Sequence, residues 1–252
     1  MKTLRNGVVL SNELFIEYQN YLSGSADYSR DLLKKILAFH FDGFVSNVKQ
    51  YQDCGVIIPK DIESAMRQSG LVDQTLCDLA RDYTIYKIIL TNNPDKHNFP
   101  YVNINDKEEN VSVSVTGCFK VAERRSKAVE HIAALCSGAK ELIIYDKYLN
   151  NTDRGVLDRI ESVLDRIIPQ TTVKVFYDTL LTRSIKYLSN ACQHRSFEKK
   201  NFPDLHDRYI VIDKRIEVML SSGFDHLSFD NGKELTYVIR SINKNTSRLS
   251  VR

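Results

Sequence analysis

The sequence predicts an α/β protein in which helices flank a mixed sheet, preceded by a mainly helical N-terminal region. The first 115 residues contain amphipathic segments whose apolar residues recur every three or four positions. After residue 116, helical and strand-like segments alternate with short connections, which is typical of parallel strands covered by helices. The last three strand-like segments follow one another directly, which favours antiparallel neighbours in the same sheet.

The N-terminal region, residues 1–115, is expected to be mainly helical. Helices are predicted over 12–22 and 30–51, and a further helix over 61–68 with Asp61 as its cap. The apolar, β-branched run at 84–92 predicts a strand. Turn-rich and polar residues follow it, so we expect a boundary near 105–117 and a second domain over 116–252.

The second domain begins with alternating elements and ends in a hairpin. The pattern predicts helices and strands in turn: a helix over 119–138, a strand over 141–146, a helix over 154–168, a strand over 172–178 and a helix over 179–194. Three β-rich segments come last, YIVID, IEVML and ELTYVIRSI. The first two are separated by a two-residue break, which predicts a hairpin and therefore a mixed sheet.

The composition is that of a soluble globular protein. The chain has 252 residues, 42% of them hydrophobic, and a formal net charge of +3, which allows a local basic patch without requiring one. No apolar run reaches the length of a membrane span, and the N-terminal apolar run is too short for a signal peptide. Five scattered cysteines without a CxxC pair indicate reduced thiols in a cytoplasmic protein, with no zinc site.

The residues with the strongest chemical signal lie around the predicted hairpin. Alternation along a strand places His206 and Arg208 on the same side, near its start. A guanidinium is suited to gripping two phosphate oxygens, and an imidazole can attack phosphorus or transfer a proton near neutral pH. Asp213 follows the strand and is expected to orient the ring or balance charge, while Ser221 and Ser222 follow the next strand and offer donors. The group suits a phosphodiester.

This arrangement resembles the HxKxxxxD signature of the phospholipase D (PLD) superfamily, with Arg208 in the lysine position. The family continues, after one more strand, into a turn with glycine and serine, where this chain has SSGFD at 221–225. Upstream, ELIIYDKYL is similar to the strand and Asp-x-Tyr segment, here Asp146 and Tyr148, of the PLD-like domain at the C-terminus of MIT-domain proteins. The resemblance runs over residues 116–245 and implies a PLD-like mixed sheet.

The resemblance also implies a mechanism without metal or other cofactor. In the superfamily one histidine attacks phosphorus, a second protonates the leaving oxygen, and water then releases the product. Here His206 would be the nucleophile, Arg208 would hold the phosphate, Asp213 would orient and Ser222 would assist. None of the other five histidines begins an HxK or HxR pattern. Either two chains therefore share their motifs in a homodimer, or the site is half-built and only binds.

Several features favour the binding alternative. Arginine for lysine changes the donor geometry, and Asp225 stands where the family has asparagine. The MIT-protein branch is understood as a phosphoinositide- and membrane-binding module without catalysis. A structural interpretation also stays open, in which Arg208 pairs with Asp204 or Asp207 at a solvated strand end. Asp213 and the two serines would then be turn formers.

Two function classes follow from these residues. The first is a metal-independent phosphodiesterase, a nuclease acting on DNA or RNA as a homodimer, which would suit a role in defence. The second is a non-catalytic module for acidic phospholipid headgroups or the nucleic-acid backbone. Basic clusters favour nucleic acid if they share one face: Lys214 and Arg215, Arg195 with residues 198–200, and Arg124, Arg125 and Lys127. The N-terminal region would provide dimerisation, substrate selection or contact with a regulating protein partner, or else the main activity.

Overall fold

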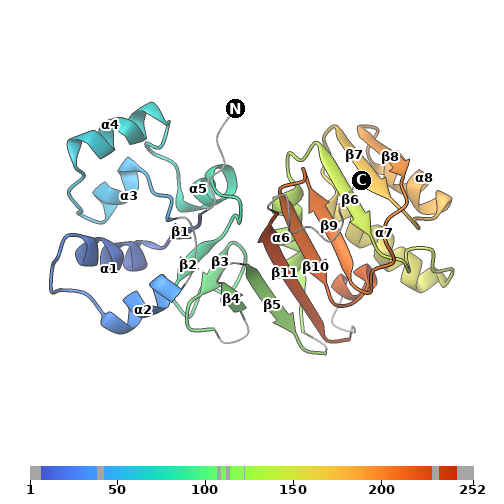
Figure 1. The fold of residues 1–252 in the computed structure, drawn as a ribbon, viewed down its shortest axis with the longest axis horizontal. Coiled ribbons are helices and arrows are strands. Elements are labelled where there is room, and N and C mark those ends of the chain that lie inside the picture. Colours follow the sequence, from blue (N-terminus) through green and yellow to red (C-terminus); the bar gives the residue numbers. More distant parts are fainter. Residues whose placement is uncertain are drawn as a thin grey trace. The chain divides into compact units, whose positions relative to one another are not determined.

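A computed structural model shows an α/β protein, as the sequence predicts. The chain divides into two compact units, Met1–Val113 and Ser114–Arg252. Figure 1 shows helices prevailing in the first unit and a large sheet in the second. The structure describes residues 7–38, 43–106, 109–111, 114–121, 123–228 and 233–242.

The first unit surrounds a small parallel sheet with helices. Strands β1 (Val9–Leu10), β2 (Ile89–Thr91) and β3 (Tyr101–Asn103) lie in that order, and β4 (Glu109–Val111) follows in sequence. The helices are α1 (Asn12–Leu22), α2 (Arg30–Ala38), α3 (Val48–Asp53), α4 (Lys60–Gln68) and α5 (Leu76–Tyr83). Apolar side chains of α5, a helix that the sequence did not lead us to expect, form a core cluster with those of β1 and β2.

The helix predicted over 30–51 is wrong as a single element. The first helix ends at Ala38, residues 39–42 lie outside the described part of the chain, and a separate helix, α3, follows. Gly43 has a φ of 141°, a conformation that other residues rarely adopt. The Asn47 side chain then caps α3 by accepting a hydrogen bond from its first turn. Apolar spacing continues across this break, which is why the pattern suggested one helix.

Two other expectations for this unit need correction. Helix α4 begins at Lys60 after Pro59, so Asp61 lies in its first turn and is not its cap. An acidic residue there still favours the helix, because it faces the positive end of the helix dipole. The strand predicted over 84–92 is shorter, since only Ile89–Thr91 pairs with neighbours.

The second unit has a mixed sheet, which confirms the predicted fold class. Its strands lie in the order β5-β11-β10-β9-β6-β7-β8. The neighbours β6, β7 and β8 are parallel, and the pairs from β5 to β6 are antiparallel, including the predicted β9–β10 hairpin. The strands are β5 (Val115–Phe119), β6 (Glu141–Tyr145), β7 (Val173–Tyr177), β8 (Arg195–Lys199), β9 (Arg208–Ile212), β10 (Ile216–Leu220) and β11 (Leu235–Ser241).

Helices cover one face of this sheet. Figure 1 shows α6 (Ser126–Cys136) and α7 (Arg154–Ile167) against it, and α8 (Thr182–Ala191) packs on α7 and β8. A short 3-10 helix, η1 (Phe224–Leu227), lies against α6 and α7. Leu142 and Ile144 of β6 and Leu164 of α7 are fully buried. Each such side chain contributes roughly 1.5–3 kcal/mol by leaving water.

The segment that leads into β9 packs on the other face. Tyr145 and Tyr209 belong to a buried cluster there, and Phe202 and Leu205 pack against it. The Leu205 amide donates a hydrogen bond of 2.7 Å to the Tyr145 hydroxyl. These contacts hold the chain just before His206 against the sheet.

Two strands of the second unit, β5 and β8, differ from what the sequence predicts. The expected helix over 119–138 begins only at Ser126, and β5 precedes it. Arg195 and the run 198–200 were read as a basic cluster, but Arg195–Lys199 is the edge strand β8. The Arg195 guanidinium is buried, pairs with Asp165 at 2.5 Å and donates to backbone carbonyls. It therefore does not contribute to a surface basic rim.

Two properties of the whole chain accompany this fold. Across the described ranges, every helix is too short or too polar to cross a bilayer. The cysteines Cys54, Cys77, Cys118, Cys136 and Cys192 are all free thiols.

Candidate functional site

Three strand ends meet where the resemblance places a site. The antiparallel register sets Tyr209 of β9 opposite Tyr145 of β6, so Asp146, just after β6, lies beside Arg208 at the start of β9. The same register sets Arg208 opposite Leu220, the last residue of β10, and Ser221 follows it. Residues far apart in sequence thus share one edge of the sheet.

Arg208 is the centre of this group. Its Nε lies 3.6 Å from Asp146 Oδ1, and its Nη1 donates hydrogen bonds to the backbone carbonyls of Ser221 (3.2 Å) and His206 (3.4 Å). Its side chain is 14% exposed. Nε is buried and has no hydrogen-bond partner within the described ranges, and no described residue accepts a hydrogen bond from Nη2. The guanidinium is therefore held by Asp146 and two carbonyl groups and keeps Nη2 as a donor that no described residue uses.

Asp146 is the carboxylate that holds this guanidinium. It is buried, and its Oδ1 accepts a hydrogen bond of 2.9 Å from the backbone amide of Tyr148. Burial raises the pKa of Asp146, while that hydrogen bond, the Arg208 charge and a hydrogen bond from the Phe224 backbone act in the opposite direction. A buried carboxylate next to an arginine neutralises part of the charge that a phosphate would meet.

The turn after β10 comes very close to Asp146. A Cβ atom on Gly223 would lie 2.6 Å from Asp225 Oδ1 and 3.6 Å from Asp146 Oδ2. A side chain at position 223 would therefore displace the Asp225 carboxylate. Two carboxylates, Asp146 and Asp225, consequently lie near the same turn, and the Asp225 charge further raises the pKa of Asp146.

Tyr148 forms the outer wall of the site. Its side chain is 53% exposed, and the Arg208 guanidinium lies 5.1 Å from the centre of its ring. Lys147 Nζ lies 5.5 Å from the same ring and forms an ion pair with Asp204 at 3.3 Å. Cation–π contacts of this kind orient a guanidinium without consuming its donors.

His206 lies outside the strand, with its ring largely in solvent. It precedes β9 in a bend, its side chain is 87% exposed, and its Nδ1 lies 3.3 Å from Asp207 Oδ1. Arg208 contacts its backbone carbonyl, not its ring. The expected pairing of Arg208 with Asp204 or Asp207 is therefore replaced by the pair with Asp146.

The two serines serve mainly to join β10 and β11. Ser221 Oγ accepts a hydrogen bond of 2.9 Å from the Thr236 amide, and Ser222 Oγ donates one of 3.1 Å to the Glu234 carbonyl. Only the backbone carbonyl of Ser221 touches Arg208. This is the turn-forming alternative, with both hydroxyl groups engaged by the backbone.

Asp213 and Lys214 lie at the opposite end of β9. Asp213 has a φ of 47°, and its Oδ1 accepts hydrogen bonds from the backbone amides of Lys140 (2.9 Å) and Glu141 (2.8 Å). Lys214 pairs with Glu141 at 3.3 Å. Asp213 is five steps along the chain from Arg208, which at the rise of a strand is about 16 Å. The structure thus corrects the placement of Asp213 and Lys214 beside the phosphate, since they fasten the hairpin to the start of β6.

His226 is a neighbour that the sequence analysis set aside. Its Nε2 lies 3.6 Å from Asp225 Oδ2, and its backbone carbonyl accepts a hydrogen bond of 2.6 Å from Arg125. Burial lowers the pKa of His226, whereas the negative charge of Asp225 raises it. The positive charges of Lys233, Arg125 and Arg159 lower this pKa further. In the sequence, only its position next to Asp225 indicated that His226 lies near the site. Within the described residues, no three His, Cys, Asp or Glu side chains gather as metal ligands would.

Comparisons with known proteins give no family assignment. No family model and no curated protein matches the chain. Among solved structures, NucT from Helicobacter pylori is 19% identical, with a TM-score of 0.30, and the match covers 50% of this chain and 85% of that one. Nuc from Salmonella typhimurium, a phospholipase D family member, is 18% identical with a TM-score of 0.30, covering 51% and 83%. Similarity at this level is too low to transfer a function.

Proposed function

We propose that the Arg208 site binds a phosphodiester and that the protein is a metal-independent phosphodiesterase, a nuclease acting on DNA or RNA. One observation carries the proposal: the guanidinium of Arg208 is fixed by Asp146 and two carbonyls at the start of β9, while no described residue accepts a hydrogen bond from its Nη2. A fixed, permanently charged donor fork is suited to phosphate oxygens. His206 lies two residues away with an exposed ring.

His206 would act as the nucleophile. With Nδ1–H directed at Asp207, the lone pair of Nε2 is free to attack phosphorus. The new P–N bond forms as the P–O bond to the leaving group breaks, and an imidazolium from a second copy gives its proton to that oxygen. Water then cleaves the P–N bond, and the second imidazole takes up the proton of the water. Because the chain has one such motif, the mechanism requires a homodimer, and a ring as exposed as that of His206 is accessible to a second copy.

The non-catalytic alternative is supported by the carboxylates of the site. Asp146 lies 3.6 Å from Arg208, and Asp225 lies beside the same turn. Negative charge accumulates on phosphorus oxygens during attack, and nearby carboxylates oppose it. In this second candidate function, Arg208 recognises a phosphate of an acidic lipid headgroup or of a nucleic-acid backbone, and His206 takes no part.

The test measures cleavage, binding and solution mass on the full chain in EDTA. Short single-stranded DNA and RNA are incubated with wild type, His206→Ala and Arg208→Gln, and the mass is measured by light scattering. The enzyme proposal predicts a dimer whose cleavage is lost in both variants. Cleavage that persists in His206→Ala, or a strict monomer that cleaves, contradicts it.

The same preparations test the alternative. A recognition module leaves the nucleic acids intact and binds them, or vesicles containing acidic lipid, in a salt-sensitive way. That binding weakens in Arg208→Gln and not in His206→Ala. Binding that is unaffected by Arg208→Gln contradicts both candidate functions.

A further inference from the structure

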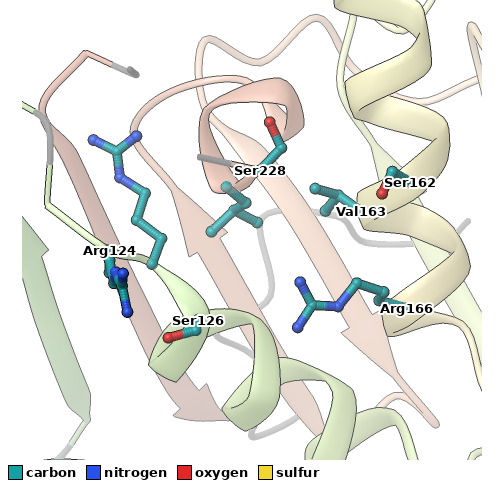
Figure 2. Close-up of a pocket in the computed structure, with 8 residues that line it drawn as sticks. Arg124, Ser126, Ser162, Val163, Arg166 and Ser228 are labelled. Atoms are coloured by element: carbon teal, nitrogen blue, oxygen red, sulfur yellow. The ribbon is translucent and has the colours of Figure 1, made fainter. Parts of the chain in front are cut away.

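A basic pocket is lined by residues other than those around Arg208. It has a volume of about 360 Å³ and lies between the start of α6, the C-terminal half of α7 and the end of η1 (Figure 2). Val163 and Leu227 give it an apolar wall, and Arg124 and Arg166 flank it. None of its described lining residues is acidic, and none belongs to the group around Arg208. Pockets of this size are suited to small molecules.

Helix α7 separates its charges between two sides. Its acidic residues Asp158, Glu161 and Asp165 bind Arg183, Ser184 and Arg195, which belong to α8 and β8. Arg159, Ser162 and Arg166 recur at spacings of three and four, and Ser162 and Arg166 line the pocket. The side of α7 that faces the pocket is therefore positive, because its carboxylates are engaged elsewhere.

The arginines that line the pocket differ in what they bind. Arg125 is buried, and its guanidinium donates hydrogen bonds to the backbone carbonyls of His226 and Lys233. These bonds hold η1 in place. Arg124 and Arg166 are exposed, and neither has an ion pair or hydrogen bond to the part of the chain that the structure describes. In Figure 2 the Arg166 side chain extends from α7 toward the start of α6. Arg124 and Arg166 thus both line the pocket, and among the described lining residues there is no carboxylate to balance their charges.

Neutral donors complete the pocket. Helix α6 begins at Ser126 and has no side-chain cap, so its positive end opens here. The hydroxyl groups of Ser126 and Ser162 belong to the lining. Guanidinium groups, hydroxyl groups and a helix start together are the donors that a phosphoryl group binds.

We propose that this pocket binds the dianionic phosphate monoester of a small molecule. Arg124 and Arg166, which form no ion pair within the described ranges, supply two positive charges for the two negative charges of a monoester, whereas each phosphodiester of a polymer carries one. The apolar wall of Val163 and Leu227 would contact the organic part. Because a monoester loses its second proton near pH 6, its binding strengthens as the pH rises through that value.

Calorimetry on the full chain tests the pocket with two matched ligands. Adenosine 5′-monophosphate is a dianionic monoester, and cyclic adenosine 3′,5′-monophosphate is a monoanionic diester of the same nucleoside; inositol 1-phosphate and inorganic phosphate test other carriers. We expect saturable binding of a monoester, weaker at pH 5 than at pH 7.5, and much weaker binding of the cyclic diester. Arg124→Ala and Arg166→Ala should each weaken it roughly tenfold.

Two control variants separate this pocket from other charges. Arg154→Ala removes an exposed arginine from the same helix outside the pocket and should change the affinity less than twofold. Arg208→Gln should leave monoester binding intact, so failure of the proposed function does not affect this test. Equal weakening by Arg154→Ala, no saturable monoester binding, or tighter binding of an oligonucleotide without a terminal phosphate through Arg124 and Arg166 would overturn the proposal.

Discussion

At its N-terminal end, β9 presents Arg208 to a buried carboxylate 3.6 Å away, whereas at its C-terminal end Asp213 accepts hydrogen bonds from two backbone amides. Both residues belong to one sequence pattern, yet a five-residue strand separates them. At the first end the Arg208 guanidinium stays partly exposed to solvent. At the second end the Asp213 carboxylate fastens the hairpin turn through hydrogen bonds to the backbone. Members of a motif can therefore differ in purpose, with binding at one end and folding at the other.

The largest effect on stability is expected at the hairpin end. Asp213→Ala removes the acceptor of two backbone hydrogen bonds and places alanine at a φ of 47°. Because the site is exposed, we expect a loss of about 1–2 kcal/mol in the free energy of unfolding. Urea denaturation measures it. Asp213→Asn keeps one acceptor oxygen and tolerates the conformation, so it should lose less, and an unchanged stability in Asp213→Ala contradicts the assigned role.

A smaller effect, on proton binding, is expected at the Arg208 end. Burial raises the pKa of Asp146 in the folded state, so folding favours its protonated form. This contribution to stability is complete below the unfolded pKa and is lost as the pH rises through the folded pKa. Asp146→Asn has no carboxyl group to titrate and so does not lose stability in this way. The free energy of unfolding of the variant minus that of wild type should therefore increase from pH 3 to pH 7. A relative stability that falls with pH would argue against it.

Replacing Arg208 tests the pKa of Asp146 from the other side of the ion pair. Its charge lowers the pKa of Asp146 against the effect of burial. In Arg208→Gln the pKa of Asp146 should therefore rise further, as carbon-13 NMR titration of the carboxyl group can measure. A fall in this pKa on removal of the guanidinium is incompatible with the observed ion pair.

The smallest effect is expected for Lys214. Its ammonium group pairs with Glu141 on the exposed hairpin, and such pairs contribute little. Lys214→Ala should change the free energy of unfolding by less than about 0.5 kcal/mol. Phosphodiester binding should also stay within twofold of wild type. A large loss of binding would move the site toward the hairpin and erase the difference between the two ends.

Much of the fold was predictable because many elements bury one regular face. The predicted strand at 141–146 and helix at 154–168 match β6 and α7 to within one residue. The helix over 30–51 failed because its break depends on the backbone of Gly43 and the cap at Asn47, which apolar spacing does not reveal. Strand β8 was missed because, as an edge strand, it has only Arg195 buried, and so lacks an apolar alternation.

The candidate site was predictable in part. Residues at strand ends indicated that Asp146, Arg208 and Ser221 come together, because adjacent strands end at one edge. The distance between Arg208 and Asp213 follows from the rise of a strand, about 3.3 Å per residue. The motif gives only their separation in sequence, which does not show that they lie at opposite ends of the strand. The pairing of Asp146 with Arg208 depends on the register of β6 and β9, which no local pattern contains.

The most direct test compares two arginines that flank β9. Arg208→Gln and Arg215→Gln remove the same charge from the open end and from the exposed hairpin end. Fluorescence anisotropy with a short single-stranded oligonucleotide in EDTA then measures phosphodiester affinity. The account predicts a loss of roughly tenfold or more for Arg208→Gln and less than twofold for Arg215→Gln. Equal losses, or a greater loss for Arg215→Gln, would contradict it.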